Sequence, residues 1–254
     1  MIRDDAKKGA NEDKFFRDIC IYLNTVDYIK ETLQSVHDSL NSLLDEPFND
    51  QVDFKSEEDL CVAYLNTFVG IIKNTLDNKL VQIFTNQVLK LPLDKMEENP
   101  MNSSPYVENI KSCVSGVIFL VRDKMNSVYF TKLLNSICQS INSKYIETIY
   151  KFRRVSEKGG RQLQLDYGEI RRILYDINKN DEGGFYSKFY TTFVNKNCEK
   201  PAAIIKILIA GNAEIQPYLS SFANEIPPAE IEKILMLKSF TKKEILSMLN
   251  SLSK

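Results

Sequence analysis

The stretch of sequence that decides the fold is residues 156–177, SEKGGRQLQLDYGEIRRILYDI. Its apolar residues recur at steps of four and three, the period of one face of an α-helix. These residues are Leu163, Tyr167, Ile170, Leu174 and Ile177. The pair Gly159-Gly160 predicts a turn that breaks the chain before this helix begins. Gly168 lies mid-helix, where it costs about 1 kcal/mol relative to Ala, so we expect another helix to pack close against it.

Four long helices are predicted before this stretch. Apolar residues repeat at steps of three and four over residues 16–43, 56–91, 104–125 and 128–152. Long helices joined by short connections are typical of an antiparallel bundle. The segment 93–103, between the second and third helices, has the most loop-like composition, and we expect it to be mobile.

Six shorter helices are predicted from the decisive stretch onward. The first follows the Gly159-Gly160 pair and runs to Ile177, and the others take residues 185–194, 201–209, 215–223, 227–238 and 245–252. Pro201 and the pair Pro227-Pro228 indicate helix starts, and Thr241 with Glu244 forms a capping box. The sequence therefore predicts an all-α protein with two helical bundles in tandem, end to end. The N-terminal bundle of long helices takes residues 1–156, and the C-terminal bundle of shorter helices takes residues 157–254.

The residues needed for catalysis are scarce. The chain has one histidine, His37, and five cysteines scattered singly, which indicates reduced thiols that fill the core. No nucleophile motif accompanies His37, and no Cys or His residues have zinc-ligand spacing. The glycine pairs 159–160 and 183–184 lack the preceding strand that a phosphate-binding loop requires. We therefore expect no enzymatic activity, no metal and no cofactor.

Charge and hydropathy limit the classes of partner that the sequence favours. The formal net charge is -1, which gives no argument for nucleic-acid binding. The longest apolar run, residues 202–210, is about half the ~20 residues that a membrane span needs. We therefore expect a soluble, cytosolic protein whose membrane contact, if it has any, is peripheral. The polar N-terminal residues look like a cut into a larger protein.

One region concentrates basic charge. Residues 144–172 hold eight basic and four acidic side chains. One interpretation is the solvated surface of a bundle. The other is a docking patch for an anionic membrane, at about 1 kcal/mol per Lys or Arg near the surface, or for an acidic partner helix.

The decisive stretch also resembles a known family. The run Gln162-Leu163-Gln164-Leu165-Asp166 is followed by Ile170, Arg171, Ile173, Leu174 and Asp176. This pattern resembles the C-terminal region of the vacuolar protein sorting fifty-three family, a subunit of the Golgi-associated retrograde protein (GARP) tethering complex. That family typically reads Gln-Leu-Leu-Leu-Asp, from which Gln164 departs. Further matching residues extend the likeness over roughly residues 104–252, among them Ser104-Pro105-Tyr106-Val107, Lys206 and Lys238.

The resemblance implies a non-enzymatic subunit of a vesicle tether in retrograde transport from endosomes to the trans-Golgi network. Related tethers are rods of helical bundles. The implied partners are other GARP subunits, mainly through parts outside this fragment, and a SNARE or small GTPase on the vesicle or Golgi membrane. Peripheral contact with anionic lipid is a further implied interaction, and the implied location is the trans-Golgi network and endosomal membranes. The alternative is a helical scaffold subunit of a different tethering or adaptor complex.

The basic cluster and the family-like stretch coincide, which gives a hypothesis for the binding surface. The surface comprises Lys151, Arg153, Arg154, Arg161, Gln162, Asp166, Glu169 and Arg172. We expect it to recognise vesicles, SNAREs or membranes.

Overall fold

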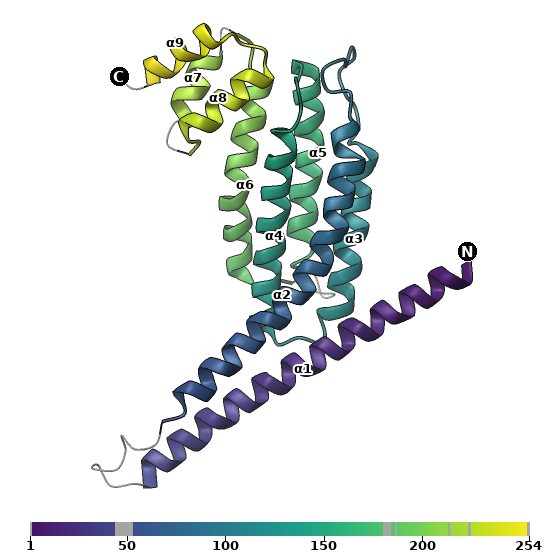
Figure 1. The fold of residues 1–254 in the computed structure, drawn as a ribbon, viewed down its shortest axis with the longest axis vertical. Coiled ribbons are helices and arrows are strands. Elements are labelled where there is room, and N and C mark those ends of the chain that lie inside the picture. The colour runs from purple at the N-terminus through teal and green to yellow at the C-terminus, as the bar shows by residue number, and fades with distance from the viewer. Residues whose placement is uncertain are drawn as a thin grey trace. The chain divides into compact units, whose positions relative to one another are not determined.

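The computed structural model describes residues 2–43, 53–179, 184–185, 187–212, 214–222 and 225–252, with side chains from residue 11 onward. Over these residues the chain is all-α, as predicted (Figure 1). The only β-type pairing found within the described part of the chain is an isolated antiparallel bridge between Lys179 and Phe185.

The helices in chain order are α1 (Ile2–Leu43), α2 (Lys55–Asn86), the short 3-10 helix η2 (Val88–Lys90), α3 (Pro105–Val121), α4 (Ser127–Ile149), α5 (Glu157–Asp176), α6 (Lys188–Ile209), α7 (Ile215–Phe222), α8 (Pro228–Leu237) and α9 (Lys242–Leu252). Several helices begin where the sequence signals predict. Pro105 and Pro228 open α3 and α8. Thr241 and Glu244 form the expected capping box before α9, with the Thr241 amide donating to the Glu244 carboxylate at 2.7 Å.

Contacts divide the chain into two compact units, of which the first takes residues 1–76 and 115–134. It holds α1, the first part of α2, the end of α3, the start of α4 and the turn between these two helices. Its core includes Phe16, Leu23, Leu65 and Ile72, all fully buried. The Asn24 side-chain amide donates to the carbonyl of Lys124 at 2.7 Å, which ties α1 to the residues after α3.

The second unit takes residues 77–114 and 135–254. It holds the end of α2, the start of α3, most of α4 and all of α5 to α9. Helices α4, α5 and α6 run side by side (Figure 1), and α5 packs along α6. The rings of Tyr145 in α4 and Tyr167 in α5 lie 5.1 Å apart in the core. The domain boundary proposed at residue 156 stays a prediction, which separate expression of the two parts would test.

Helix α6 corrects the prediction of two helices over residues 185–194 and 201–209. It is one helix of 22 residues with Pro201 inside it. An interior proline costs about 3 kcal/mol because it removes a backbone hydrogen bond. Here Pro201 is buried among Cys198, Ile204 and Ile205 on the inward face of α6. Burial of this face offsets the cost, so the C-terminal part of the chain has five helices, α5 to α9, instead of six within the described residues.

Candidate interaction surface at the junction of α4 and α5

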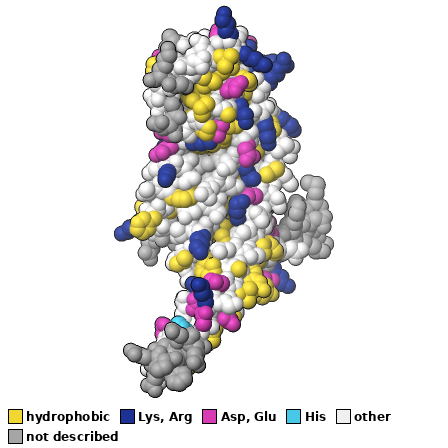
Figure 2. Space-filling view, turned by 60° about the vertical axis from the view of Figure 1, so that its left-hand side comes forward, with side chains coloured by type: hydrophobic (Ala, Val, Ile, Leu, Met, Phe, Trp, Pro, Cys, Tyr) yellow, Lys and Arg dark blue, Asp and Glu magenta, His cyan; other side chains and the backbone are white. Residues whose placement is uncertain are grey.

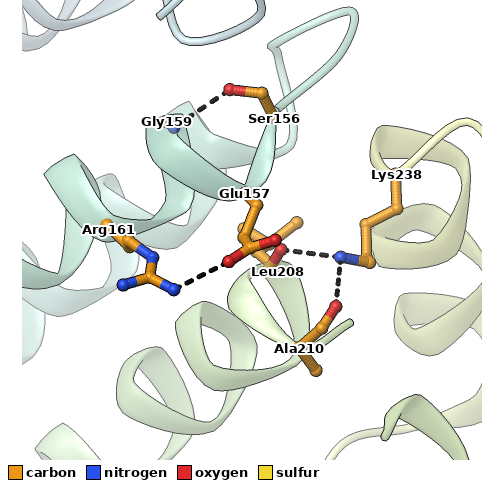
Figure 3. Close-up of polar contacts among 7 residues, drawn as sticks. All are labelled: Ser156, Glu157, Gly159, Arg161, Leu208, Ala210 and Lys238. Atoms are coloured by element: carbon orange, nitrogen blue, oxygen red, sulfur yellow. Dashed lines mark hydrogen bonds and ion pairs between the residues drawn. The ribbon is translucent and has the colours of Figure 1, made fainter. Parts of the chain in front are cut away.

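The junction is built from Ser156, which caps α5. Its hydroxyl oxygen accepts a hydrogen bond from the Gly159 amide at 3.0 Å (Figure 3). The same hydroxyl donates to the carbonyl of Leu93 at 2.7 Å, and the Ser156 amide donates to that carbonyl at 3.0 Å. One serine therefore starts α5 and fixes it to the segment that follows η2.

The glycine pair lies inside α5, in its first turn, which corrects the predicted turn. A Cβ on Gly159 would lie 2.1 Å from the carbonyl oxygen of Leu93. A Cβ on Gly160 would lie 3.0 Å from a side-chain carbon of Ile209 and 3.4 Å from the backbone of α6. Both glycines are buried. Glycine is required at both positions because two other backbone segments approach the helix here. Neither glycine interrupts the helix.

Gly168 has the opposite surroundings. It is exposed, and a Cβ placed on it would meet no described atom within 4 Å. The prediction that another helix packs against Gly168 is therefore wrong.

Lys238 joins the ends of three helices at this junction (Figure 3). Its ammonium group donates to the carbonyls of Leu208 and Ala210, each at 2.8 Å, and so caps the C-terminus of α6. Burial lowers the pKa of the Lys238 amine, and the nearby carboxylate of Glu157 at the start of α5 opposes that shift. The half-buried cation thus holds the end of α8 against α5 and α6.

Gln162 and Asp166 lie in the interior, although we predicted them at the surface. The fully buried carboxylate of Asp166 accepts hydrogen bonds from the Ser104 amide at 2.6 Å, the Ser104 hydroxyl at 2.8 Å and the Gln162 amide at 2.8 Å. Ser104 directly precedes α3, so the carboxylate sits at a helix N-terminus, where negative charge is favoured. The two residues are four apart and share the inward side of α5. Their role is to position α3 against α5.

The segment 93–103 is held along α5 by hydrogen bonds. Its first residue, Leu93, is buried and bonded to Ser156. Lys158 donates to the carbonyl of Glu97, and the Gln162 side chain donates to the carbonyl of Asn102 at 3.0 Å. With these tethers, we expect a less mobile segment than its composition indicates.

The loop between α4 and α5, residues 150–156, presents three exposed cations: Lys151, Arg153 and Arg154. No ion pair or hydrogen bond of these side chains is found among the described residues. The loop itself is fixed, because the amide of buried Val155 donates to the carbonyl of Leu237 at 2.9 Å. These cations follow the C-terminus of α4, where positive charge interacts favourably with the negative end of the helix dipole. In the space-filling view, Lys and Arg side chains gather at the upper end of the face shown (Figure 2).

The exposed strip of α5 carries the remaining predicted residues. Arg161 and Arg172 are eleven positions apart, or about three turns, and therefore share a face with Leu165 and Gly168 between them. Arg161 pairs with Glu157 at 2.8 Å, and Arg172 pairs with the partly exposed Glu169. A pocket beside the strip is lined by Ser104, Glu108, Lys111, Leu165, Glu169 and Arg172, among others.

The eight predicted residues therefore separate into three groups. Lys151, Arg153 and Arg154 lie together in the α4–α5 loop, and Arg161, Glu169 and Arg172 lie along the exposed strip of α5. Gln162 and Asp166 lie beneath that strip. Sequence reasoning gave no role to Leu93 and Lys238, which organise the junction. Helical spacing carries no signal for either residue, because the bonds join distant parts of the chain. The Leu93 carbonyl accepts from Ser156, and Lys238 donates to the carbonyls of Leu208 and Ala210.

The described residues contain no group of three or more His, Cys, Asp or Glu side chains that could hold a metal ion. All five cysteines are free thiols and four are buried. His37 is half-buried, with its ring 6.2 Å from the ring of Phe54. In the part of the chain that the structure describes, each helix is too short or too polar to cross a membrane.

The buried polar side chains of this junction join helix ends to one another, and the remaining charged side chains are exposed on an all-α protein. No family model matches the chain. It is 23% identical over 241 residues to vacuolar protein sorting-associated protein 53 A of Arabidopsis thaliana, and 20% identical over 244 residues to the vacuolar protein sorting-associated protein 53 homolog of Caenorhabditis elegans.

The two matches confirm the resemblance stated from the sequence. They cover 94% and 92% of this chain, but only 28% and 29% of the two relatives. The chain therefore spans less than a third of the length of the curated relatives it matches. This share is consistent with the C-terminal fragment expected from residues 104–252.

Proposed function

We propose that this chain is the C-terminal part of a non-enzymatic subunit of a vesicle tethering complex of the GARP type. The proposed process is retrograde transport from endosomes to the trans-Golgi network, with peripheral association at both membranes from the cytosolic side. The observation that carries the proposal is the similarity to two vacuolar protein sorting-associated proteins over more than nine-tenths of the chain. The all-α architecture agrees with it. Other subunits of the complex bind mainly through parts outside this fragment.

The surface that recognises the vesicle is, in this proposal, the α4–α5 loop with the exposed strip of α5. Lys151, Arg153 and Arg154 project from a loop that is anchored to the segment after η2 and to α8. A fixed loop loses little conformational entropy on binding, which favours recognition. The ion pairs of Arg161 and Arg172 are exposed and worth about 0–1 kcal/mol each, so a partner can replace them at small cost.

The partner at this surface is an acidic segment of a SNARE or small GTPase, or an anionic lipid headgroup. Each single contact is weak, and a tether with several such subunits gains affinity through avidity. Nothing is transformed in this mechanism. A rigid helical unit presents charge at a fixed place and holds the vesicle near its target.

The test is co-flotation of the chain with endosome-derived vesicles and with protein-free anionic liposomes. The variant Arg153→Glu/Arg154→Glu reverses two loop charges. The matched control Lys14→Glu/Arg17→Glu makes the same change of net charge at two exposed positions of α1. We expect the wild type and the control to float with vesicles and the loop variant to remain in the soluble fraction.

The outcomes distinguish a protein partner from a lipid partner. Binding to vesicles alone indicates a protein partner, and equal binding to liposomes indicates lipid. Loss of binding in both variants would mean that general electrostatic attraction is responsible, and binding by the loop variant would remove this surface from the proposal.

The alternative function is a scaffold subunit of a different tethering or adaptor complex. The resemblance to the GARP subunit predicts that the full-length protein is accompanied in cells by the other GARP subunits. Purification from cells should recover the other GARP subunits, and recovery of another tether or an adaptor complex would support the alternative.

A further inference from the structure

Two cysteines from different helices lie against each other in the core of the second unit. Cys138 belongs to α4 and Cys198 to α6, and these helices run side by side (Figure 1). The Asn142 side-chain amide donates to the sulfur of Cys138 at 3.5 Å and to that of Cys198 at 3.8 Å. The two thiols are also hydrogen-bonded to each other. Both are buried, so the packing of α4 against α6 forms a pair that their spacing in the sequence does not show.

The surroundings of the two sulfur atoms differ. The hydrogen bond that the Cys138 thiol donates lowers the pKa of Cys198, against the effect of burial. Asn142 and the charge of Arg171 act in the same direction. The same hydrogen bond, together with burial, raises the pKa of Cys138. The thiolate is the nucleophilic form of cysteine, so Cys198 is the reactive member of the pair and Cys138 stays a thiol beside it.

The amide that contacts both sulfur atoms is held in one orientation. The Tyr167 hydroxyl donates to the Asn142 side-chain oxygen at 2.8 Å, which turns the amide nitrogen toward the thiols. A nucleophilic cysteine with a second cysteine beside it is the arrangement of a thiol that is oxidised and a thiol that resolves the product. The three helices α4, α5 and α6 each supply a part of this arrangement.

The same core holds a hydroxyl group without a partner. The Tyr190 hydroxyl of α6 is buried and makes no hydrogen bond within the described part of the chain. Burial raises the pKa of Tyr190, and the charges of the nearby Cys138 and Cys198 raise it further. An unpaired buried donor costs free energy, and a redox role is one reason for which such a group is kept. A sulfur atom that carries an oxygen offers this donor an acceptor.

A pocket between α4 and α6 gives small molecules access to the pair. Its volume is about 710 Å³, and its lining includes Gln139, Asn142 and Asn197. Gln139 directly follows Cys138 in the sequence, and Asn197 directly precedes Cys198. Because Asn142 lines the pocket and also contacts both sulfur atoms, a small uncharged oxidant in the pocket lies one side chain away from the thiols.

We propose that Cys138 and Cys198 are a site of reversible oxidation, at which a peroxide converts the two thiols to a disulfide that joins α4 to α6. The Cys198 thiolate attacks one oxygen of hydrogen peroxide, the O–O bond breaks, and a sulfenic acid and hydroxide form. The Cys138 sulfur then attacks the sulfur of the sulfenic acid. The S–O bond breaks, and the thiol proton leaves with the sulfenic hydroxyl as water.

The atoms and electrons of the two steps balance. The two thiols lose two hydrogen atoms in total, and one peroxide is reduced to two molecules of water, the second from the hydroxide and the proton that Cys198 gave up. A dithiol reductant reverses the oxidation by thiol–disulfide exchange. This site lies apart from the α4–α5 loop and does not depend on the function proposed for that surface.

Mass spectrometry of the whole chain, after treatment with a small molar excess of hydrogen peroxide, tests the proposal. We expect a disulfide between tryptic peptides 133–144 and 197–206, which a dithiol reductant removes. It should form at least about tenfold faster than any oxidation of Cys113. Cys113 is the control because it is more exposed than either member of the pair. Earlier oxidation of Cys113, or a disulfide that forms only in urea, would overturn the proposal.

Single substitutions test the roles of the two sulfur atoms. In Cys138→Ala the sulfenic acid has no resolving thiol, so we expect dimedone to trap it on Cys198. In Cys198→Ala we expect Cys138 to remain reduced. The matched control Cys20→Ala removes another buried thiol and should leave the disulfide unchanged. Circular dichroism checks that each variant is folded. Equal trapping on the remaining cysteine of Cys138→Ala and Cys198→Ala would contradict the mechanism.

The stability of the oxidised chain provides a second measurement on the wild-type protein. A disulfide between Cys138 and Cys198 closes a long loop of the unfolded chain and so restricts its freedom. We expect peroxide treatment to raise the urea midpoint of unfolding by about 0.5 M or more, and the reductant to restore it. Cys138→Ala should show no such shift. A fall in the midpoint of the wild type would mean that the core cannot hold this disulfide, which would also overturn the proposal.

Discussion

At the scale of single residues, the glycines of α5 have opposite surroundings although they share one helix. Gly159 faces the carbonyl of Leu93, and Gly168 faces open space. We expect Gly159→Ala to destabilise the protein by about 2 kcal/mol or more, because a backbone segment must move. Gly168→Ala should stabilise it by about 0.5–1 kcal/mol, because alanine loses less entropy in a helix. Urea denaturation of both variants measures the difference, and a similar effect of the two changes would contradict this packing.

The hydrogen bonds of the Glu230 carboxylate indicate that the stability of the protein depends on pH. Glu230 in α8 accepts hydrogen bonds from Lys200 in α6 at 2.8 Å and from Tyr150, directly after α4, at 2.7 Å. Burial alone would raise the pKa of Glu230, but the hydrogen bonds from Lys200 and Tyr150 outweigh it and hold the pKa below its usual value. A lowered pKa in the folded state contributes stability above the unfolded value. That contribution is lost as the pH falls through the folded value.

We therefore expect Glu230→Gln to lower the free energy of unfolding at neutral pH and to flatten its decline between about pH 5 and pH 3. Urea midpoints over that range measure both effects. The control is Glu232→Gln, at an exposed position of the same helix. If Glu230→Gln and Glu232→Gln give the same profile, the contacts of Glu230 contribute nothing to stability.

Residue roles at the junction were only partly predictable. Three-and-four spacing identified the buried apolar residues of α5, such as Leu163 and Ile170. It did not place Gln162 in the interior, because Gln162 lies about 100° around the helix from Leu163, at the edge of the apolar stripe. Asp166 is buried because Ser104, 62 positions earlier, supplies its hydrogen bonds. No local pattern contains that information.

At the scale of elements, the C-terminus of α6 depends on a side chain from another helix. Lys238 supplies donors to two carbonyls that α6 cannot satisfy itself. We expect Lys238→Met to cost about 1–3 kcal/mol, because buried carbonyls lose their partners. Hydrogen exchange of the Ala210 amide, which is bonded to the carbonyl of Lys206 at 3.0 Å, should accelerate about tenfold or more. The exposed neighbour Lys242 serves as control, since Lys242→Met should leave this exchange unchanged.

Helix boundaries were predictable where the signal is local. The capping box before α9 and the prolines that open α3 and α8 act within one helical turn, and the structure confirms them. Pro201 gave the wrong prediction because its effect depends on the surrounding packing. Residues 2–15 of α1 were missed because they contain too few apolar residues to show a period.

At the scale of the whole molecule, the all-α class followed from periodicity, whereas the grouping of the helices did not. Amphipathic stripes show that each helix has an inward side without showing which helix it faces. The contacts place α5 with α4: the Tyr145 hydroxyl donates to the carbonyl of Leu163 at 2.9 Å. The Tyr167 hydroxyl donates to the Asn142 side chain at 2.8 Å. Both bonds are buried and cross residue 156.

A pair of fragments tests this grouping. Fragment 157–254 lacks α4 and would expose Leu163, Tyr167 and Ile170, which are buried in the intact chain. We expect it to bind a hydrophobic dye and to unfold without a cooperative transition. Fragment 77–254 retains all of the second unit and should unfold cooperatively. If fragment 157–254 instead folds cooperatively, the boundary predicted at residue 156 is a true domain boundary, and the bonds from Tyr145 and Tyr167 join two bundles that are each stable alone.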